Sequence, residues 1–227
     1  MEADSGGERD FRLPFSREEL RDLIVSRVGE GKAPTSFQIV TDTTNFMQVD
    51  YGDVALLAGR PYLIRSNERE GRFGLDDEPK YWVKRSIDLI TGEMKVIKLG
   101  FLEEFQSRVG PMTFNFFRSP RKEATVLDLV RGDSRFMQGF SVPDEAGNTV
   151  RIIDYIVGKA LSERVITLGS DHEDYFVNHF PEIYRTFIDL VEAIRFLHEQ
   201  GEKHGDIRRD HILVERESGR WRWIDFD

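Results

Sequence analysis

The sequence predicts an α+β fold, because two different periodicities follow one another along its 227 residues. From Phe37 to Leu102 the chain reads as a series of short β-type runs separated by turn residues. From Pro181 to Leu197 apolar residues instead recur with a period near 3.6, which is the pattern of one long amphipathic helix. We therefore expect an N-terminal antiparallel sheet followed by the start of a mainly helical lobe.

The composition is that of a globular protein, with 39% hydrophobic residues, 32% charged residues and 17 Phe to fill a core. A formal net charge of −9 opposes nonspecific attraction to nucleic acid, so we expect no nucleic-acid partner. The absence of Cys rules out disulfides and thiolate metal sites. No apolar stretch reaches the ~18 residues of a membrane span, and residues 1–10 lack the pattern of a signal peptide, so we expect a cytoplasmic protein.

Residues 1–36 are predicted to form an N-terminal extension with one helix. Residues 1–15 are rich in Gly and charge, which is typical of a flexible lead. Ser16 is a good N-cap, and Glu19 three residues later completes a capping box. The helix that begins there should pack through an apolar stripe formed by Leu20, Leu23, Ile24 and Val28.

Five short runs are predicted to be strands of the N-terminal sheet, namely Phe37–Val40, Val54–Leu57, Tyr62–Arg65, Tyr81–Leu89 and Met94–Leu99. The last two are joined by a tight turn that contains Gly92 and form the clearest hairpin. A helix around Pro120–Val130 should follow. Two further strands, Ser134–Val142 and Thr149–Ile156, are expected to pair and extend the sheet.

Beyond Gly158 the chain is predicted to be helical until Gly201 stops the long amphipathic helix. That helix delivers the chain to His204. Two short runs, Ile212–Glu215 and Trp221–Phe226, then read as a hairpin that ends in acidic residues.

A kinase-like pattern lies in this last part, in Gly201-Glu-Lys-His-Gly-Asp-Ile-Arg-Arg-Asp-His-Ile-Leu-Val and in Trp221-Arg-Trp-Ile-Asp-Phe-Asp. It resembles the protein kinase superfamily, which pairs an H-x-D-x-x-x-x-N loop with a hairpin that ends in D-F-G. His204 and Asp206 match H-x-D, and Asp225-Phe226 matches the end of the hairpin. Because both parts occur in the correct order, the joint match is far more specific than either part.

The resemblance implies roles for three residues of this pattern. Asp206 would orient or deprotonate the attacking hydroxyl, and Asp225 would hold Mg²⁺ against the phosphates. Arg208 lies two residues after Asp206, where protein kinases carry a lysine that faces the transferred phosphate. A guanidinium can match phosphate oxygens, so Arg208 is expected to stabilise charge in the transition state.

Upstream, Met94-Lys-Val-Ile-Lys-Leu resembles the kinase strand that ends in the phosphate-binding lysine. Lys98 is the candidate, because Lys95 would point to the opposite face of a strand. The resemblance also implies a helix glutamate that holds this lysine. Glu123 is the best-placed choice, and Glu103 and Glu104 are alternatives closer in sequence.

Two further segments would complete a nucleotide site. Arg151-Ile-Ile-Asp-Tyr-Ile-Val-Gly resembles the strand and hinge between kinase lobes, so backbone groups from Asp154 to Ile156 would meet adenine. Glu70-Gly-Arg-Phe-Gly-Leu offers Gly71 and Gly74 as a thin phosphate loop, with G-x-x-G in place of the family's G-x-G-x-x-G.

The sequence departs from the family at the second metal-binding position, where His211 replaces Asn. Imidazole is a poor ligand for Mg²⁺, so Asp225 would hold the metal with His211 as an atypical contact, Asp210 would help, or activity would be weak. Gly205 is typical of aminoglycoside phosphotransferases and related small-molecule kinases. Asp227 and the loop histidine also resemble some lipopolysaccharide-core sugar kinases.

The resemblance runs from Tyr62 to Asp227, the equivalent of the D-F-G end. It implies a kinase-like N-lobe at residues 37–156 and a partial C-lobe at 157–227, as expected for a truncated kinase. The implied function is ATP-dependent transfer of a phosphoryl group, with Mg²⁺, to a hydroxyl of a protein Ser/Thr or of a small molecule. A pseudokinase without turnover and a purely structural fragment are the alternatives.

Overall fold

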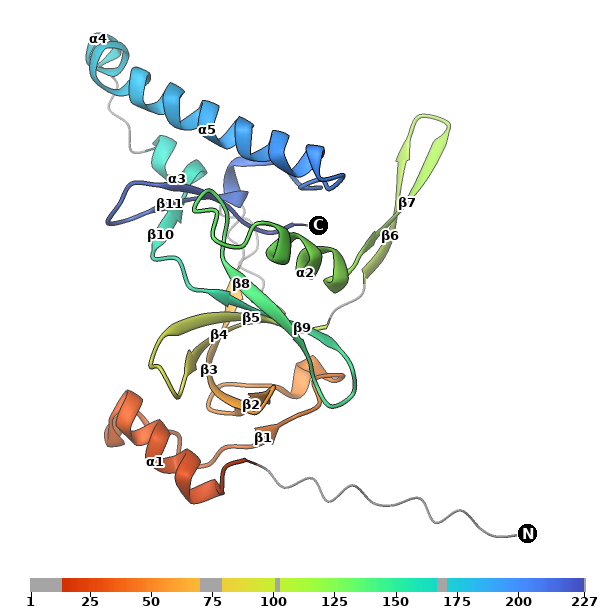
Figure 1. Cartoon of the computed structure of the whole chain (residues 1–227), viewed down its shortest axis with the longest axis vertical. Helices are drawn as coiled ribbons and strands as arrows, with labels where there is room; N and C mark the ends of the chain where they lie inside the picture. The colour runs from red at the N-terminus through yellow and green to blue at the C-terminus, as the bar shows by residue number, and fades with distance from the viewer. Residues whose placement is uncertain (1–13, 70–78, 101–102, 167–170, 227) are drawn as a thin grey trace.

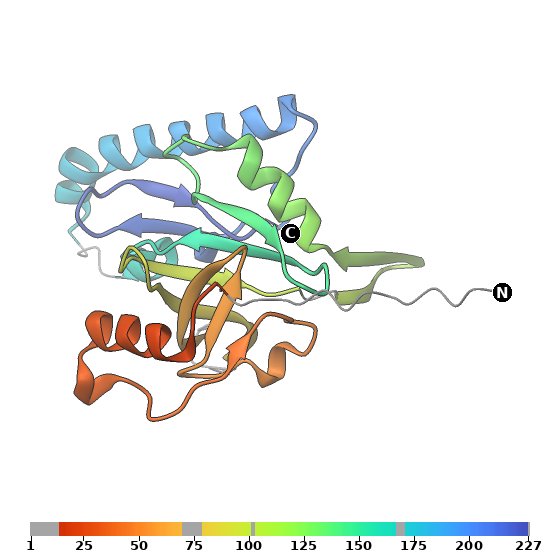
Figure 2. The same ribbon diagram turned by 60° about the horizontal axis from the view of Figure 1, so that its bottom comes forward.

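The computed structural model describes residues 14–69, 79–100, 103–166 and 171–226. A curled sheet occupies the middle of the molecule, with α1 (Arg17–Val28) at one end and α5 (Phe180–Glu199) at the other (Figure 1). The same layers are seen from another side in Figure 2. The predicted α+β fold with an N-terminal antiparallel sheet is confirmed.

The main sheet has seven strands in the order β1-β2-β3-β4-β5-β9-β8. Its strands are β1 (Ile39–Val40), β2 (Val54–Leu57), β3 (Arg60–Arg69), β4 (Pro79–Asp88), β5 (Met94–Lys98), β8 (Gly139–Pro143) and β9 (Thr149–Asp154). All neighbouring pairs are antiparallel except β1 with β2. The predicted hairpin is present, since β4 pairs with β5 from Val83↔Lys98 to Ile87↔Met94. This pairing places the end of β5 in the middle of the sheet.

The N-terminal helix begins where the capping signals place it. Ser16 is the N-cap of α1, and both hydrogen bonds of the capping box with Glu19 are formed. Leu20 and Ile24 are buried in a small core under the sheet, where they belong to the same cluster as Leu63. The helix therefore closes one side of the sheet, as its apolar stripe predicted.

A second hairpin, β6 (Glu103–Val109) with β7 (Met112–Arg118), projects from the body before α2 (Pro120–Leu129) (Figure 1). No pattern in the sequence predicted this hairpin. Its turn contains Gly110 with φ of +59°, a left-handed conformation that glycine adopts without steric cost. Ser119 then caps α2, whose first residue is Pro120.

A small second sheet contains the hairpin that the sequence predicts after His211. It consists of β10 (Gly158–Ala160), β11 (Ile212–Glu215) and β12 (Trp221–Trp223). The remaining helices are α3 (Leu161–Ile166), α4 (His172–Asp174), a π turn (Tyr175–His179) and short 3₁₀ turns at Glu30–Lys32, Phe46–Gln48 and Arg209–His211. The sequence predicted helix directly after Gly158, but residues 158–160 form a strand that pairs with β11. The local sequence pattern did not indicate this strand, because its partner lies more than fifty residues away.

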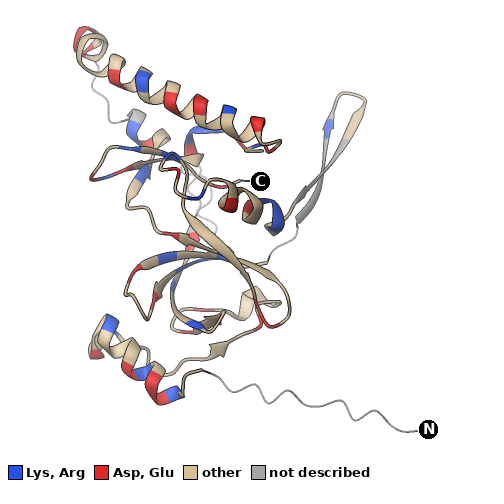
Figure 3. Cartoon of the chain, viewed as in Figure 1, with Lys and Arg blue, Asp and Glu red and all other residues tan. Residues whose placement is uncertain are grey.

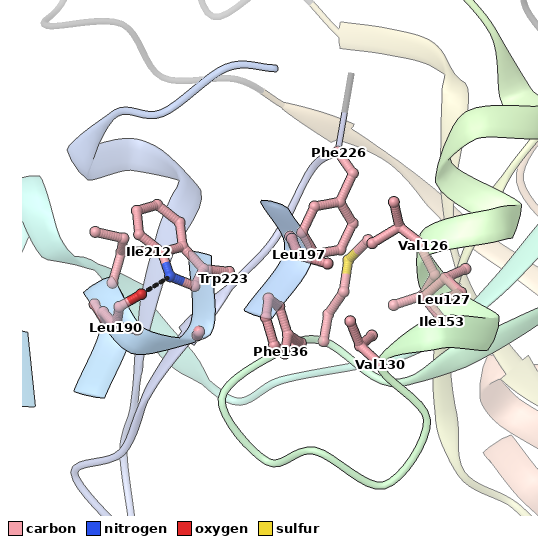
Figure 4. Packing of buried hydrophobic residues seen from close by; sticks show 12 residues of the cluster. Val126, Leu127, Val130, Phe136, Ile153, Leu190, Leu197, Ile212, Trp223 and Phe226 are labelled. Atoms are coloured by element: carbon pink, nitrogen blue, oxygen red, sulfur yellow. Dashed lines mark hydrogen bonds between the residues drawn. The ribbon is translucent and has the colours of Figure 1, made fainter. Parts of the chain in front are cut away.

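The largest core cluster joins α2 to α5 and to the hairpin of β11 and β12 (Figure 4). Val126 and Leu127 from α2 lie in it with Leu190 and Leu197 from α5. Trp223 also belongs to it, and its indole Nε1 donates to the Leu190 carbonyl at 3.1 Å. Each such buried side chain contributes roughly 1.5–3 kcal/mol. The cluster thus holds α2 against α5 and against the hairpin of β11 and β12. The lobe boundary near residue 156 stays a prediction.

Only one face of α5 contributes to this core. Its other face exposes Tyr184, Phe187, Ile188 and Val191. Both signs of charge occur along α1 and α5, as expected for helices that contact water (Figure 3). Within the described residues, no helix is both long enough and apolar enough to cross a membrane.

Candidate functional site

Lys98, at the end of β5, is the centre of a buried charge cluster. Its Nζ lies 2.5 Å from Oε1 of Glu123 on α2 and 2.5 Å from Oδ1 of Asp225 after β12. Burial by itself lowers the pKa of Lys98, but the charges of Asp225 and Glu123 outweigh it and raise that pKa above its usual value. Lys98 is therefore a fully charged ammonium held between two carboxylates.

Lys95 lies on the opposite face of β5, as the alternation of side chains along a strand requires. Its Nζ pairs with Asp154 at 2.7 Å and with Glu93 at 2.8 Å, away from the Lys98 cluster. Glu103 and Glu104 belong to β6, in the hairpin that precedes α2. Among the glutamates considered, Glu123 is the one that the structure pairs with Lys98.

Glu123 has a second cationic partner that sequence reasoning missed. Nε of Arg151, on β9, lies 3.1 Å from Oε2 of Glu123, and both side chains are almost fully buried. The Arg151 guanidinium also donates to the carbonyls of Leu99 and Thr149. The sequence signal that could have indicated this contact is the charge of Arg151, because its immediate neighbours in β9 are apolar.

Asp225 has a strained backbone, with φ of +63°. Left-handed φ is uncommon for a residue other than Gly, although Asp tolerates it better than most, and such conformations cluster at functional sites. The neighbouring Phe226 is 2% exposed and anchors the segment in the core. Burial raises the pKa of Asp225, but the nearby Lys98 and Lys80 outweigh it and hold that pKa well below its usual range.

His204 is a structural residue beneath the loop that leads to β11. It is 1% exposed, and its ring centroid lies 4.9 Å from that of Trp223 and 5.0 Å from that of Phe226. Burial lowers its pKa to about 4. A neutral histidine packed in this way supports the loop and does not face a substrate.

Asp206, Arg208 and His211 form the other half of the site. Nε of Arg208 lies 3.3 Å from Oδ2 of Asp206. The His211 ring lies between two carboxylates, since its Nδ1 is 3.5 Å from Oδ2 of Asp206 and its Nε2 is 3.3 Å from Oδ2 of Asp225. The imidazole therefore lies between the two halves of the site.

A cavity of about 400 Å³ opens between the main sheet and the hairpin of β11 and β12. Lys98, Glu123 and Asp225 line it together with Asp154 and Ile156. Apolar side chains from both sheets also line it, among them Val83, Val96, Ile153 and Leu213. The volume is within the range of small-ligand sites, and the combination of apolar walls with a charged cluster is typical of such sites.

The segment predicted as the hinge leaves one backbone donor available. The Asp154 N–H donates to the Gln138 carbonyl at 2.9 Å, and the Tyr155 N–H donates to the Met94 carbonyl at 3.3 Å. The Ile156 N–H donates no hydrogen bond to another described residue, although Ile156 lines the cavity. A ligand in the cavity can therefore accept from it. Gly71 and Gly74 lie outside the described residues.

The residues fit a single metal ion better than a pair. In the described part of the chain, no three His, Asp or Glu side chains are arranged to hold a metal by themselves. Mg²⁺, however, needs only one or two carboxylates when phosphates and water supply the other ligands. Asp225 meets that requirement. The Asp210 carboxylate also lines the cavity, where it accepts from the Ser162 hydroxyl, and both His211 nitrogens have other partners.

No protein-family model matches the chain. A probable serine/threonine-protein kinase, fnkB of Dictyostelium discoideum, is 24% identical over 54% of the chain and 22% of its own length. The serine/threonine-protein kinase par-4 of Caenorhabditis elegans is 20% identical over 89% of the chain and 30% of its own length. The chain thus spans less than a third of these relatives. A crystal structure of Rad53 with AMP-PNP aligns over 64% of this chain and 34% of its own, with TM-score 0.42 and 19% identity.

The chain is thus distantly similar in sequence to serine/threonine protein kinases, and its fold brings Lys98, Glu123 and Asp225 together. The chain is a kinase-like protein of the protein-kinase-like superfamily.

Proposed function

We propose that the chain binds ATP in the cavity between its lobes and transfers the γ-phosphoryl group to a hydroxyl. The observation that supports this most strongly is the contact of one lysine, Lys98, with carboxylates from α2 and from the end of the hairpin. Phosphoryl transfer requires mainly positioning and charge neutralisation, and such a cluster supplies both.

The proposed roles follow from the positions of the side chains. Lys98, held by Glu123, would bind phosphate oxygens once Asp225 turns to its metal. The Ile156 N–H would donate to the nucleotide base, and apolar side chains such as Val96 and Leu213 would enclose that base. Gly71 and Gly74 remain proposed phosphate-loop residues.

In the transfer step, the acceptor hydroxyl oxygen forms a bond to the γ-phosphorus as the bond from that phosphorus to the β–γ bridging oxygen breaks. Asp206 would take the hydroxyl proton, and ADP would leave. Arg208 would stabilise the charge on the transferred group. Mg²⁺, bound by Asp225, phosphate oxygens and water, would neutralise the charge that develops on the leaving oxygens.

The acceptor is proposed only as an alcohol. Both kinase relatives carry names that specify Ser/Thr acceptors, which supports a protein hydroxyl. The His204-Gly205-Asp206 motif supports a small-molecule hydroxyl instead. An acceptor screen with γ-labelled ATP, covering Ser/Thr peptides, aminoglycosides and sugars, separates the two classes.

Nucleotide binding is the first test. We expect Mg²⁺-ATP to raise the melting temperature of the chain, and expect Lys98→Met and Asp225→Asn to abolish the shift. Lys95→Met is the matched control, because Lys95 lies on the same strand but faces away. A folded parent whose melting temperature does not respond to Mg²⁺-ATP would overturn the proposal.

A pseudokinase that binds nucleotide without turnover is the second candidate. The contact of Arg208 with Asp206 favours it, because the guanidinium lies against the carboxylate oxygen that would otherwise face the acceptor hydroxyl. Saturable ATP binding with no release of ADP in the presence of any acceptor would favour this reading over the first.

A further inference from the structure

The His211 side chain differs chemically from the Asn that the kinase pattern places at this position. It is 4% exposed, and both ring nitrogens have partners. Nδ1 lies 2.9 Å from the Asp206 carbonyl, and Nε2 lies 2.7 Å from Nη2 and 2.9 Å from Nε of Arg208. A histidine held on both sides has no lone pair left to offer a metal ion.

The identity of these partners fixes the tautomer. A guanidinium only donates hydrogen bonds, so Nε2 of His211 accepts from Arg208. A backbone carbonyl only accepts, so Nδ1 carries the proton and donates to Asp206. The tautomer thus follows from the partners of the ring. In this form His211 fixes the backbone of Asp206 and the side chain of Arg208 together.

The local backbone explains why these residues meet. Residues Arg209–His211 form a 3₁₀ turn, and the His211 N–H donates to the Arg208 carbonyl at 3.1 Å. The turn places the Arg208 guanidinium next to the His211 ring and 3.3 Å from Oδ2 of Asp206. A permanent positive charge is therefore held beside the carboxylate proposed to act on the acceptor.

We propose that Arg208, oriented by His211, supplies at this site the positive charge that a second metal ion supplies in kinases with Asn at that position. The chain would then use one Mg²⁺ ion, held by Asp225, and His211 is a positioning residue. This inference rests on the proposed binding of ATP. Arg suits the role because it is always charged and matches phosphate oxygens.

The first experiment counts metal ions directly. Mn²⁺ binding to the full chain, measured by electron paramagnetic resonance with a non-hydrolysable ATP analogue, should reach one ion per nucleotide in the parent. In His211→Asn, which supplies the amide oxygen and releases Arg208, it should reach two. Two ions in the parent, or one ion in both proteins, would overturn the inference.

The second experiment tests Arg208 through the affinity for nucleotide. Arg208→Gln and His211→Leu should each weaken binding of the ATP analogue by about tenfold while changing the affinity for ADP little, as expected for a lost charged contact to the terminal phosphate. The exposed neighbour gives the control Arg209→Gln, for which both affinities should stay within about twofold of the parent. Equal losses for the analogue and ADP would contradict the assignment, because a purely structural role would not discriminate between them.

The two proposals fail in different ways. If the folded parent, verified by circular dichroism, binds no nucleotide with or without metal, the proposed function is overturned and this inference with it. If nucleotide binds together with two metal ions, only the role given to Arg208 and His211 is overturned.

Discussion

Arg151 holds Glu123 from the side opposite to Lys98. Nε of Arg151 lies 3.1 Å from Oε2 of Glu123, whereas Nζ of Lys98 lies 2.5 Å from Oε1. The glutamate is therefore fixed by the sheet itself, through an arginine that also donates to two backbone carbonyls. Since α2 is packed into the main core, that core and Arg151 together position the lysine–glutamate pair.

Arg151→Met should destabilise the chain by about 3 kcal/mol, because removal of one partner leaves buried polar groups uncompensated. Chemical denaturation measures this cost. Arg151→Met combined with Glu123→Gln should cost less than the sum of the two single changes, because the two side chains interact. Strict additivity would contradict the coupling.

Ala58 has φ of +49° in the turn between β2 and β3, a left-handed conformation that is unfavourable for alanine. Ala58→Gly should therefore stabilise the chain by about 1 kcal/mol, which thermal denaturation detects. Ala33→Gly is the control, because Ala33 has φ of −71° and gains nothing from glycine. An equal effect at both positions would rule out relief of strain as the cause.

Gly158 lies so close to β11 that a Cβ atom at this position would be 2.3 Å from the Val214 carbonyl oxygen. Gly158→Ala should destabilise the chain by about 1–3 kcal/mol through overpacking. It should also weaken nucleotide binding, since Gly158 lines the cavity. Gly31→Ala is the matched control, because a Cβ atom there meets no other atom within 4 Å. If Gly158→Ala loses no more stability than Gly31→Ala does, β10 can move away from β11 to make room for the added methyl group.

His204 should make stability fall as the pH is lowered from about 6.5 to about 4. Its pKa is about 4 in the folded chain against an ordinary value of 6.5, so in this window the unfolded chain binds the additional proton. The full loss is about 3 kcal/mol.

Denaturation curves across this pH range test the prediction. His204→Leu should remove most of the slope, whereas His198→Gln, a change at an exposed histidine of α5, should leave it intact. Parallel pH profiles for the parent and His204→Leu would assign the slope to other groups.

Local signals in the sequence account for much of the fold. The capping box at Ser16, the hairpin between β4 and β5 and the long helix before His204 were all predicted at nearly their observed positions. Each depends on residues close to one another in the chain. The hairpin of β6 and β7 was not predicted, although its two strands are also neighbours in the chain and its turn contains Gly110.

The candidate site was also only partly predictable from local signals in the sequence. The sequence by itself determined which residues are the candidates for the chemistry, since the motifs around Asp206 and Asp225 are contiguous and Lys98 ends a recognisable strand. Only the tertiary structure decided how these groups are paired. The contacts of Lys98 span 25 residues to Glu123 and 127 to Asp225, and Arg151 reaches Glu123 across 28. Such pairings arise from packing between distant elements, which no local pattern of residues encodes.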